Sequence, residues 1–137
     1  MGHRRAGREC ALQMLYGRDV GGISEDEILS AYRVMDELSP SVLEFAEELF
    51  IGVGARLDEL DRLIQRHAQN WRLGRMAAVD RNVLRLAAFE LISGGKSPDS
   101  AIINEAIELA RKFSTQDSAQ FVNGILDSIR KAVCGRQ

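Results

Sequence analysis

Apolar residues recur at alternating steps of three and four in the first half of the chain, which is the spacing of one helix face. The residues of this stripe are Leu43, Ala46, Phe50, Val53, Leu57, Leu60 and Ile64. The unbroken stripe predicts one long amphipathic helix over residues 41–67, ~40 Å long at 1.5 Å per residue. Gly52 and Gly54 fall off the stripe, where we expect them to soften this helix.

Short motifs predict where other helices begin. Pro40 and Pro98 are the only prolines, and each follows a serine just ahead of an apolar periodic stretch. A serine cap with a proline in the first turn is typical of a helix start. Ser24 and Glu27 have the spacing of a capping box, which predicts a shorter helix that begins near Ser24.

The second half of the chain contains the most apolar helix. Residues 76–92 leave little of the helix circumference polar, so this helix is expected at the centre of the core. Gly94 and Gly95 end it, a further helix runs to about Phe113, and a last helix follows. Because no stretch alternates with period two, the sequence predicts an all-α fold of six or seven helices.

The length of 137 residues suits one domain, since domains commonly have about 100 to 200 residues. We expect a single domain over residues 1–137, with helical subdivisions at about 1–70 and 71–137. The two cysteines, Cys10 and Cys134, lie at opposite ends without neighbouring histidines, which argues against a disulfide framework or a zinc site. The chain shows no membrane span and no apolar secretion signal, so we expect a cytoplasmic protein.

Charge is segregated along the chain although the net charge is only −2. Residues 20–50 carry eight acids against one arginine, whereas residues 56–85 carry seven arginines against four acids. Separate basic and acidic surfaces are therefore expected, and a basic surface suits a nucleic acid or an acidic partner. The alternative is a set of solvated helix faces without a partner.

Candidate catalytic chemistry is sparse. His3 and His67 are the only histidines, and neither has a carboxylate or a nucleophile at a telling spacing. Glu105 and Glu108 share a helix flank, but paired acids on a solvated helix are common, and His67 suits the C-terminal end of a helix dipole. The sequence therefore predicts a non-enzymatic protein without a cofactor or a metal site.

The start of the chain is basic. Arg4 and Arg8 are four residues apart and share one helix face, with Arg5 about 100° away. Arginine forks match phosphate oxygens and stack on bases, and a helix N-terminus adds free N–H groups. This helix is a candidate for binding RNA.

Four blocks of sequence resemble the NusB family of transcription antitermination proteins. They are residues 4–16 (RRAGRECALQMLY), 80–91 (DRNVLRLAAFEL), 103–113 (INEAIELARKF) and 121–127 (FVNGILD). Four blocks in order are far more specific than any one of them. Residues 18–75 match only in helical pattern.

The resemblance implies a helical bundle in two packed subdomains that binds the boxA element of ribosomal RNA and some phage leader transcripts. Binding is implied to occur with NusE, a small-subunit ribosomal protein, on an elongating RNA polymerase antitermination complex. The implied RNA-binding residues are Arg4, Arg5, Arg8, Asp117, Gln120 and Phe121. A base can stack on Phe121, although a core position for this ring remains the alternative.

Further residues follow from the same resemblance. Tyr16 and Asp80 match the NusE-facing surface, with a buried tyrosine and a first-turn helix charge as the alternatives. Gly7 stands where the family usually has alanine, and Gln120 where a basic residue is common, so weaker RNA binding by the isolated protein is expected. The runs at 104–106 and 123–124 are interpreted as structural.

Two other functions remain open. A NusB-like helical domain also forms part of some RNA methyltransferases, although this chain has no Gly-rich cofactor loop and too few residues for a catalytic domain. The other alternative is a helical protein-interaction module that uses the acidic segment 20–50. A homodimer is also possible, because helical stripes that pack a monomer can pair two copies.

Overall fold

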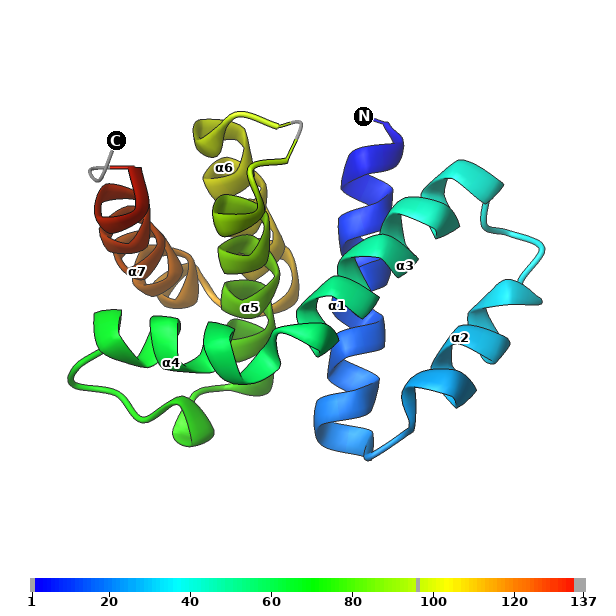
Figure 1. The fold of residues 1–137 in the computed structure, drawn as a ribbon, viewed down its shortest axis with the longest axis horizontal. Helices are drawn as coiled ribbons and strands as arrows, with labels where there is room; N and C mark the ends of the chain where they lie inside the picture. The colour runs from blue at the N-terminus through cyan, green and yellow to red at the C-terminus, as the bar shows by residue number, and fades with distance from the viewer. Residues whose placement is uncertain (1, 96, 135–137) are drawn as a thin grey trace.

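The computed structural model describes residues 2–95 and 97–134, and within these ranges it contains helices and no strand. This confirms the all-α expectation (Figure 1). The helices are α1 (His3–Gly21), α2 (Glu25–Arg33), α3 (Pro40–Ala55), α4 (Leu57–His67), the 3-10 helix η1 (Leu73–Arg75), α5 (Ala78–Ser93), α6 (Asp99–Phe113) and α7 (Gln116–Cys134).

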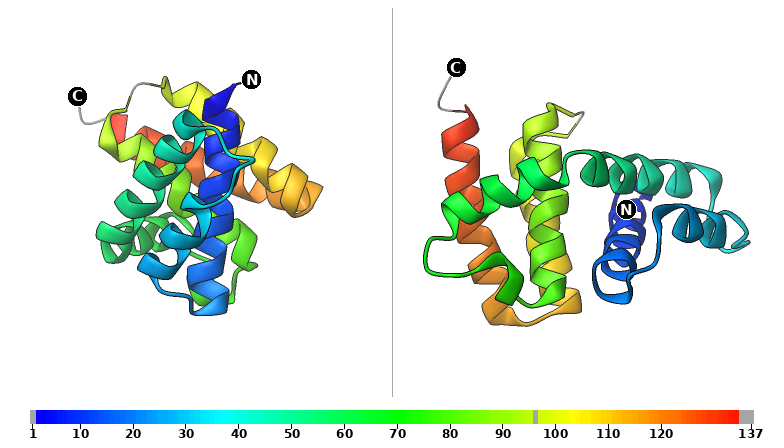
Figure 2. Two further views of the ribbon diagram at one scale, coloured as in Figure 1. Left: turned by 90° about the vertical axis from the view of Figure 1, so that its right-hand side faces the viewer. Right: turned by 60° about the horizontal axis from the view of Figure 1, so that its bottom comes forward.

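Helix α5 is the centre of the fold. It packs against α1, α3, α4, α6 and α7, and its residues from Asn82 to Ala88 are all buried. The prediction of a central helix that is apolar on nearly every side is therefore confirmed. Figures 1 and 2 show α1, α2 and α3 gathered on one side of the molecule and α4, α6 and α7 with α5 on the other. Because α4 packs on α5 and α7, the chain passes from the first group of helices to the second at Arg56.

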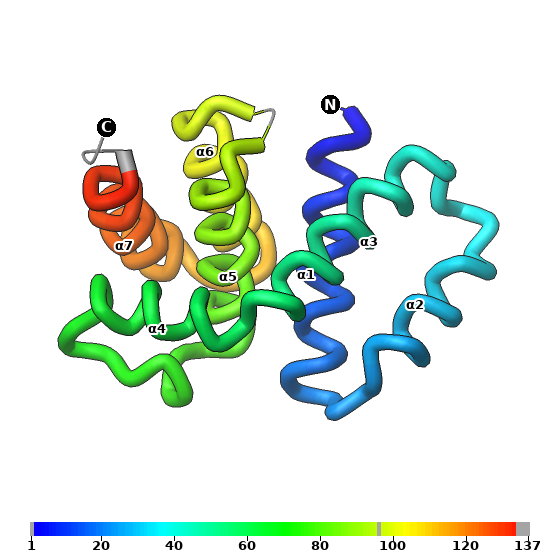
Figure 3. The backbone as a smooth tube through the Cα atoms, in the orientation of Figure 1, coloured from blue at the N-terminus to red at the C-terminus, as the bar shows by residue number. Residues whose placement is uncertain are grey.

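The prediction of one long helix over 41–67 is wrong. The chain leaves helical geometry at Arg56, with φ −122° and ψ 26°, and α4 starts at Leu57 in a new direction (Figure 3). The apolar stripe continues across the break, since Val53, Leu60 and Ile64 are all buried. Its first part packs mainly on α1, and its second part packs on α5 and α7. One apolar stripe thus serves two packing surfaces, which requires the bend.

The glycines of α3 are packing positions rather than soft points. A Cβ at Gly52 would lie 2.2 Å from the Phe89 ring of α5, and one at Gly54 would lie 2.6 Å from the Arg18 guanidinium of α1. Glycine at position 52 therefore lets the Phe89 ring approach α3, whereas at position 54 the flexible Arg18 side chain could move aside. The expectation that these residues merely soften the helix is corrected by this packing.

The predicted helix starts are confirmed with one adjustment. Ser24 and Glu27 form both bonds of a capping box, and the Ser39 hydroxyl accepts from the Val42 N–H with Pro40 in the first turn. At α6, Pro98 is itself the cap residue and Ser97 does not cap the helix. The Ser97 hydroxyl instead accepts hydrogen bonds from arginines of α1.

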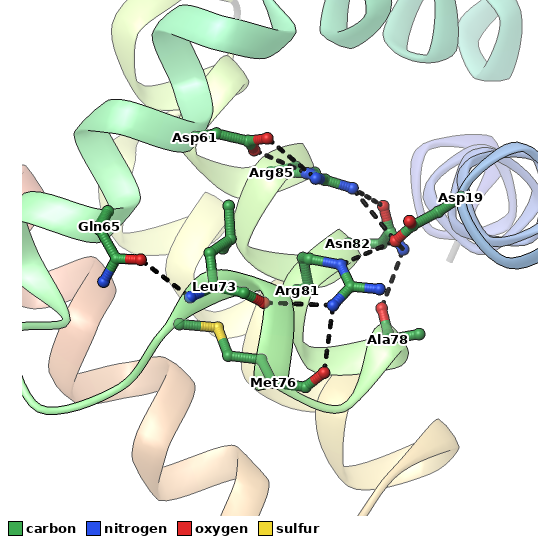
Figure 4. A network of polar contacts seen from close by, with 9 residues as sticks. All are labelled: Asp19, Asp61, Gln65, Leu73, Met76, Ala78, Arg81, Asn82 and Arg85. Atoms are coloured by element: carbon green, nitrogen blue, oxygen red, sulfur yellow. Dashed lines mark hydrogen bonds and ion pairs between the residues drawn. The ribbon is translucent and has the colours of Figure 1, made fainter.

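A polar cluster fixes the C-terminal end of α1 against α5 and α4 (Figure 4). Asp19 accepts from Arg81 Nε at 2.8 Å, from Asn82 Nδ2 at 2.9 Å and from Arg85 Nη1 at 3.2 Å. Arg85 also donates two bonds to Asp61 of α4, at 2.8 and 2.9 Å. Burial raises the pKa of Asp19, but the bonds from Arg81 and Asn82 outweigh it, so this pKa lies below its ordinary value.

The described residues hold Cys10 as a buried free thiol, whereas the side chain of Cys134 lies outside them. Within the same part of the chain, no helix is long and apolar enough to cross a membrane.

Candidate nucleic-acid interface

The N-terminal turn of α1 presents two exposed arginines. No acidic residue lies in this turn, and no side chain caps it, so its N–H groups and positive dipole end remain available. Arg4 Nη1 donates to Ser97 Oγ at 3.1 Å. Arg5 donates two bonds to Glu105 of α6, at 3.0 and 2.8 Å. Glu105 is therefore a partner of the basic turn.

Arg8 does not share the exposure that its sequence spacing predicts. Its side chain is 5% exposed and donates to both oxygens of Glu90 in α5, at 2.8 Å each. Burial acts to lower the Arg8 pKa, but the hydrogen bonds to Glu90 and its negative charge outweigh burial, so this pKa lies above its ordinary value. The expectation of an exposed Arg8 is therefore corrected, since its guanidinium is bonded to Glu90 inside the protein.

Gly7 is explained by the ring of Phe45 in α3. A Cβ at Gly7 would lie 2.6 Å from Phe45 Cδ2. The ring also lies under the guanidinium carbons of Arg4 and Arg8, with centroid distances of 5.3 and 5.6 Å, which suits cation–π attraction. Glycine at position 7 thus leaves room for the Phe45 ring, which supports the side chains of Arg4 and Arg8. The same glycine still lowers the helix propensity of this turn.

The second group of predicted residues lies at the start of α7. The Thr115 hydroxyl accepts from the Ser118 N–H at 3.0 Å, which satisfies a free donor of the first turn. The first turns of α7 then present Asp117 and Gln120 to solvent, while Phe121 is half-buried. The Phe121 ring therefore packs against the core with one part and is accessible to solvent with another.

Trp71 forms the other aromatic wall at this position. Its side chain is 59% exposed, and its ring meets the Phe121 ring edge to face, with centroids 5.6 Å apart and an interplanar angle of 78°. The two rings border a pocket of about 300 Å³. Its lining residues are Trp71, Arg75, Met76, Ala77, Asp80, Asp117, Ser118 and Phe121.

Asp80 belongs to this pocket. It is 7% exposed, and its Oδ2 accepts from Ser118 Oγ at 2.9 Å. Its other oxygen, Oδ1, is buried without a hydrogen-bond partner among the described residues. Tyr16, the other residue assigned to a protein partner, is 43% exposed on α1, so the alternative of a buried tyrosine is wrong.

The two groups of predicted RNA-binding residues lie at opposite ends of α5. Arg8 is bonded to Glu90 near the end of that helix, whereas Asp80 lies in its first turn beside the Phe121 pocket. Ten residues of helix separate the two points by about 15 Å. The structure therefore brings Asp117 and Phe121 together with Asp80, and brings Arg4 and Arg5 together elsewhere.

Sequence reasoning missed Trp71. The signal was present, because the only tryptophan of the chain stands in a polar stretch next to Arg72. A large aromatic residue in such a stretch has no helix stripe to join, which favours a surface role. The two runs interpreted as structural, 104–106 and 123–124, differ in burial. Ala106 is buried, as a structural residue would be, but Asn123 and Gly124 are exposed, with open space around Gly124.

The remaining polar side chains form no catalytic arrangement within the described chain. His67 Nδ1 lies 2.6 Å from Ser128 Oγ, and burial lowers the pKa of this histidine, with Arg66 acting in the same direction. No group of three or more histidine, cysteine or acidic side chains in the described residues could hold a metal ion. Fold and site together define a helical binding protein with two basic or aromatic surface patches.

Comparisons with known proteins agree with this class. The sequence model of the NusB family matches residues 5–131. The transcription antitermination protein NusB of Myxococcus xanthus is 46% identical over 137 residues, with 97% of this chain and 98% of the relative covered. The chain therefore belongs to the NusB family, which confirms the sequence resemblance and the non-enzymatic class that it implied.

Solved structures show the same fold. NusB of T. maritima superposes with a TM-score of 0.84 at 35% identity, covering 96% of this chain and 92% of the other. A crystal structure of the antitermination factors NusB and NusE in complex with dsRNA matches with a TM-score of 0.82 at 26% identity, covering 96% of this chain and 98% of the other.

Proposed function

We propose that this chain is an RNA-binding antitermination factor that binds boxA leader RNA together with NusE. It acts in the cytoplasm on elongating RNA polymerase, mainly in ribosomal RNA operons. The observation that carries this proposal is the Trp71–Phe121 pocket, which a chain of the NusB family presents at the start of α7. The related NusB and NusE structure with dsRNA supports RNA and NusE as the partners.

The pocket suits an unpaired base. Stacking on an aromatic ring contributes ~1–3 kcal/mol per base and tolerates any base, because every base has a π-face. Asp117 lines the pocket and adds a hydrogen-bonding group, and Gln120 is exposed next to Phe121 in the sequence. Arg4 and Arg5 supply a separate phosphate contact beyond the other end of α5. Arg8 acts in this arrangement as a positioning residue, because its bonds to Glu90 fix the turn that carries the exposed arginines.

Phe121→Ala tests the pocket. Loss of ~1–3 kcal/mol of stacking should weaken boxA RNA binding by about 5- to 150-fold at constant salt, as measured by fluorescence anisotropy with and without NusE. Phe113→Ala is the matched control, since Phe113 is an exposed phenylalanine at the end of α6, outside the pocket. Equal RNA affinity of the two variants, or a large loss of thermal stability in Phe121→Ala alone, would make Phe121 a core residue.

The arginines are tested by salt dependence. If Arg4 and Arg5 each neutralise one phosphate, they contribute about −1.4 to the slope of log affinity against log salt, from −0.7 per contact. The Arg4→Ala/Arg5→Ala variant should show a slope flatter by that amount. An unchanged slope would mean that Arg4 and Arg5 contact no phosphate and that this turn is only a solvated surface.

Tyr16 is the candidate for NusE contact. Its exposed ring can leave water on binding, so Tyr16→Ala should lower affinity for NusE while RNA binding by the isolated chain is kept. Asp80 is better assigned to the RNA pocket, whose wall it forms. Homodimer formation stays a prediction, which sedimentation over a concentration range tests.

A further inference from the structure

The side chains of four exposed arginines stand out because they make no hydrogen bond and no ion pair with any other residue in the described part of the chain. They are Arg62, Arg66, Arg72 and Arg75. Exposed arginines elsewhere have partners: Arg33 holds Glu47, and Arg111 holds Glu108. Glu59, an acid one turn before Arg62 on α4, is bonded to Arg56 at 2.8 Å. The unpaired cations are therefore concentrated within one short stretch.

These arginines surround a loop that α4 holds in place. Gln65 lies between Arg62 and Arg66, and its Nε2 donates to the Trp71 carbonyl at 2.6 Å. Its Oε1 accepts from the Leu73 N–H at 2.9 Å, the contact drawn at the left of Figure 4. A groove of about 410 Å³ on α4 is lined by Glu59, Arg62, Gln65 and Arg66. The loop bonded to Gln65 carries Trp71 to the Phe121 pocket.

Arg75 lines the Phe121 pocket together with Trp71, and the link between this pocket and the groove is Gln65, which lines the groove and bonds to Trp71. The surface is thus a run of unpaired guanidinium groups interrupted by an exposed aromatic ring. A positively charged groove with aromatic rings is the arrangement that holds single-stranded nucleic acid. Cations without internal partners repel one another, and phosphate oxygens fit the guanidinium fork well.

We propose that Arg62, Arg66, Arg72 and Arg75, with Trp71, bind the sugar–phosphate backbone of RNA that continues beyond the base held at Phe121. The inference rests on the proposed function and extends it, because RNA flanking the boxA element becomes part of the binding site. RNA is favoured over an acidic protein, since protein interfaces have an apolar, aromatic-rich core and Trp71 is the only large exposed apolar side chain described on this surface.

The test uses the full chain and three RNAs: a boxA element alone, and the same element with a tail of about ten uridines at its 5′ end or at its 3′ end. This tail length lies within the range that single-strand sites cover. The parent protein should bind one tailed RNA more tightly and with a steeper salt slope. Arg62→Ala/Arg66→Ala should lose this gain and flatten the slope on that RNA by about 1.4, from 0.7 per phosphate. Its affinity for the untailed element should stay within twofold of the parent's.

The matched control is Arg33→Ala/Arg111→Ala, which removes the same charge from exposed arginines that have carboxylate partners. It should keep the gain from the tail. The inference is overturned if the two double variants behave alike, or if Arg62→Ala/Arg66→Ala loses NusE binding and keeps the RNA slope. A parent that binds boxA RNA through Phe121 but gains nothing from a tail overturns this inference alone, whereas a parent that binds neither RNA overturns the proposed function as well.

Discussion

The Arg8→Ala variant tests whether Arg8 is a buried structural residue or a phosphate ligand. The Arg8 and Glu90 side chains are only 5% and 9% exposed, and two bonds of 2.8 Å join them. Removing one partner of such a pair leaves a buried charge without compensation, which costs about 3–5 kcal/mol. With an unfolding entropy of about 2.1 cal/mol/K per residue over the whole chain, this lowers Tm by about 10–17 °C.

Two further variants make this prediction specific. Arg8→Met/Glu90→Leu removes both charges and keeps apolar bulk, so it should recover most of the stability lost in Arg8→Ala. Arg33→Ala is the surface control: Arg33 is 54% exposed, so water and salt screen its pair with Glu47 and its loss should change stability little. Urea titration and thermal denaturation measure all three variants. Anisotropy with boxA RNA then gives their affinities and salt slopes.

The expected RNA result follows from burial. Arg8→Met/Glu90→Leu should keep the salt slope of the parent, because the Arg8 guanidinium is not available to phosphate. The reasoning is refuted if Arg8→Ala loses less than about 1 kcal/mol of stability and also flattens the salt slope by about 0.7, the value for one lost phosphate contact.

Three other expectations follow from packing and titration. Gly52→Ala should cost about 1–3 kcal/mol, since its Cβ would meet the Phe89 ring at 2.2 Å, whereas Gly124→Ala, with open space, should stabilise by up to about 1 kcal/mol; urea titrations that give equal shifts would contradict this. Burial raises the pKa of the Cys10 thiol to about 11, so iodoacetamide at about pH 8 should not alkylate it until urea unfolds the chain. Mass spectrometry measures the alkylation, and rapid labelling of Cys10 in the native protein would disprove its burial. The folded-state pKa of Asp19 lies below the ordinary 3.8, so the stability that ionised Asp19 contributes is complete above that value and is lost as pH falls through the folded pKa. The urea midpoint of Asp19→Asn should therefore fall less steeply than that of the parent below about pH 4. Parallel curves of urea midpoint against pH for the two proteins would count against the cluster.

The sequence was sufficient for features that depend on neighbours in the chain. The capping box of Ser24 and Glu27 spans three residues, and the end of α5 at Gly94 requires only a positive φ, which is 64° here. The central position of α5 also followed from its composition, because a helix without a polar face has to be covered on all sides.

Features that depend on distant partners could not be predicted. Arg4 and Arg8 share one helix face in the sequence, but Glu90, which buries Arg8, is 82 residues away. Nothing in the spacing of Leu57, Leu60 and Ile64 signals the bend at Arg56, because the stripe itself has no interruption. The division of the candidate site into two patches likewise depends on distant packing, which places the N-terminal turns of α1 near one end of α5 and the start of α7 near the other.

Helix α1 is fastened to α5 at two points, by Arg8 to Glu90 near one end and by Asp19 to Arg81 and Arg85 near the other. Eleven residues of helix place these points about 16 Å apart. A rod held at one point can pivot, whereas a rod held at two points keeps both its axial register and its crossing angle. Besides the packing of α1 on α3, these ion pairs help to fix the exposed arginines at its tip relative to the Phe121 pocket. Ion pairs that themselves need not contact RNA thus help to set the spacing between the two proposed RNA-binding patches.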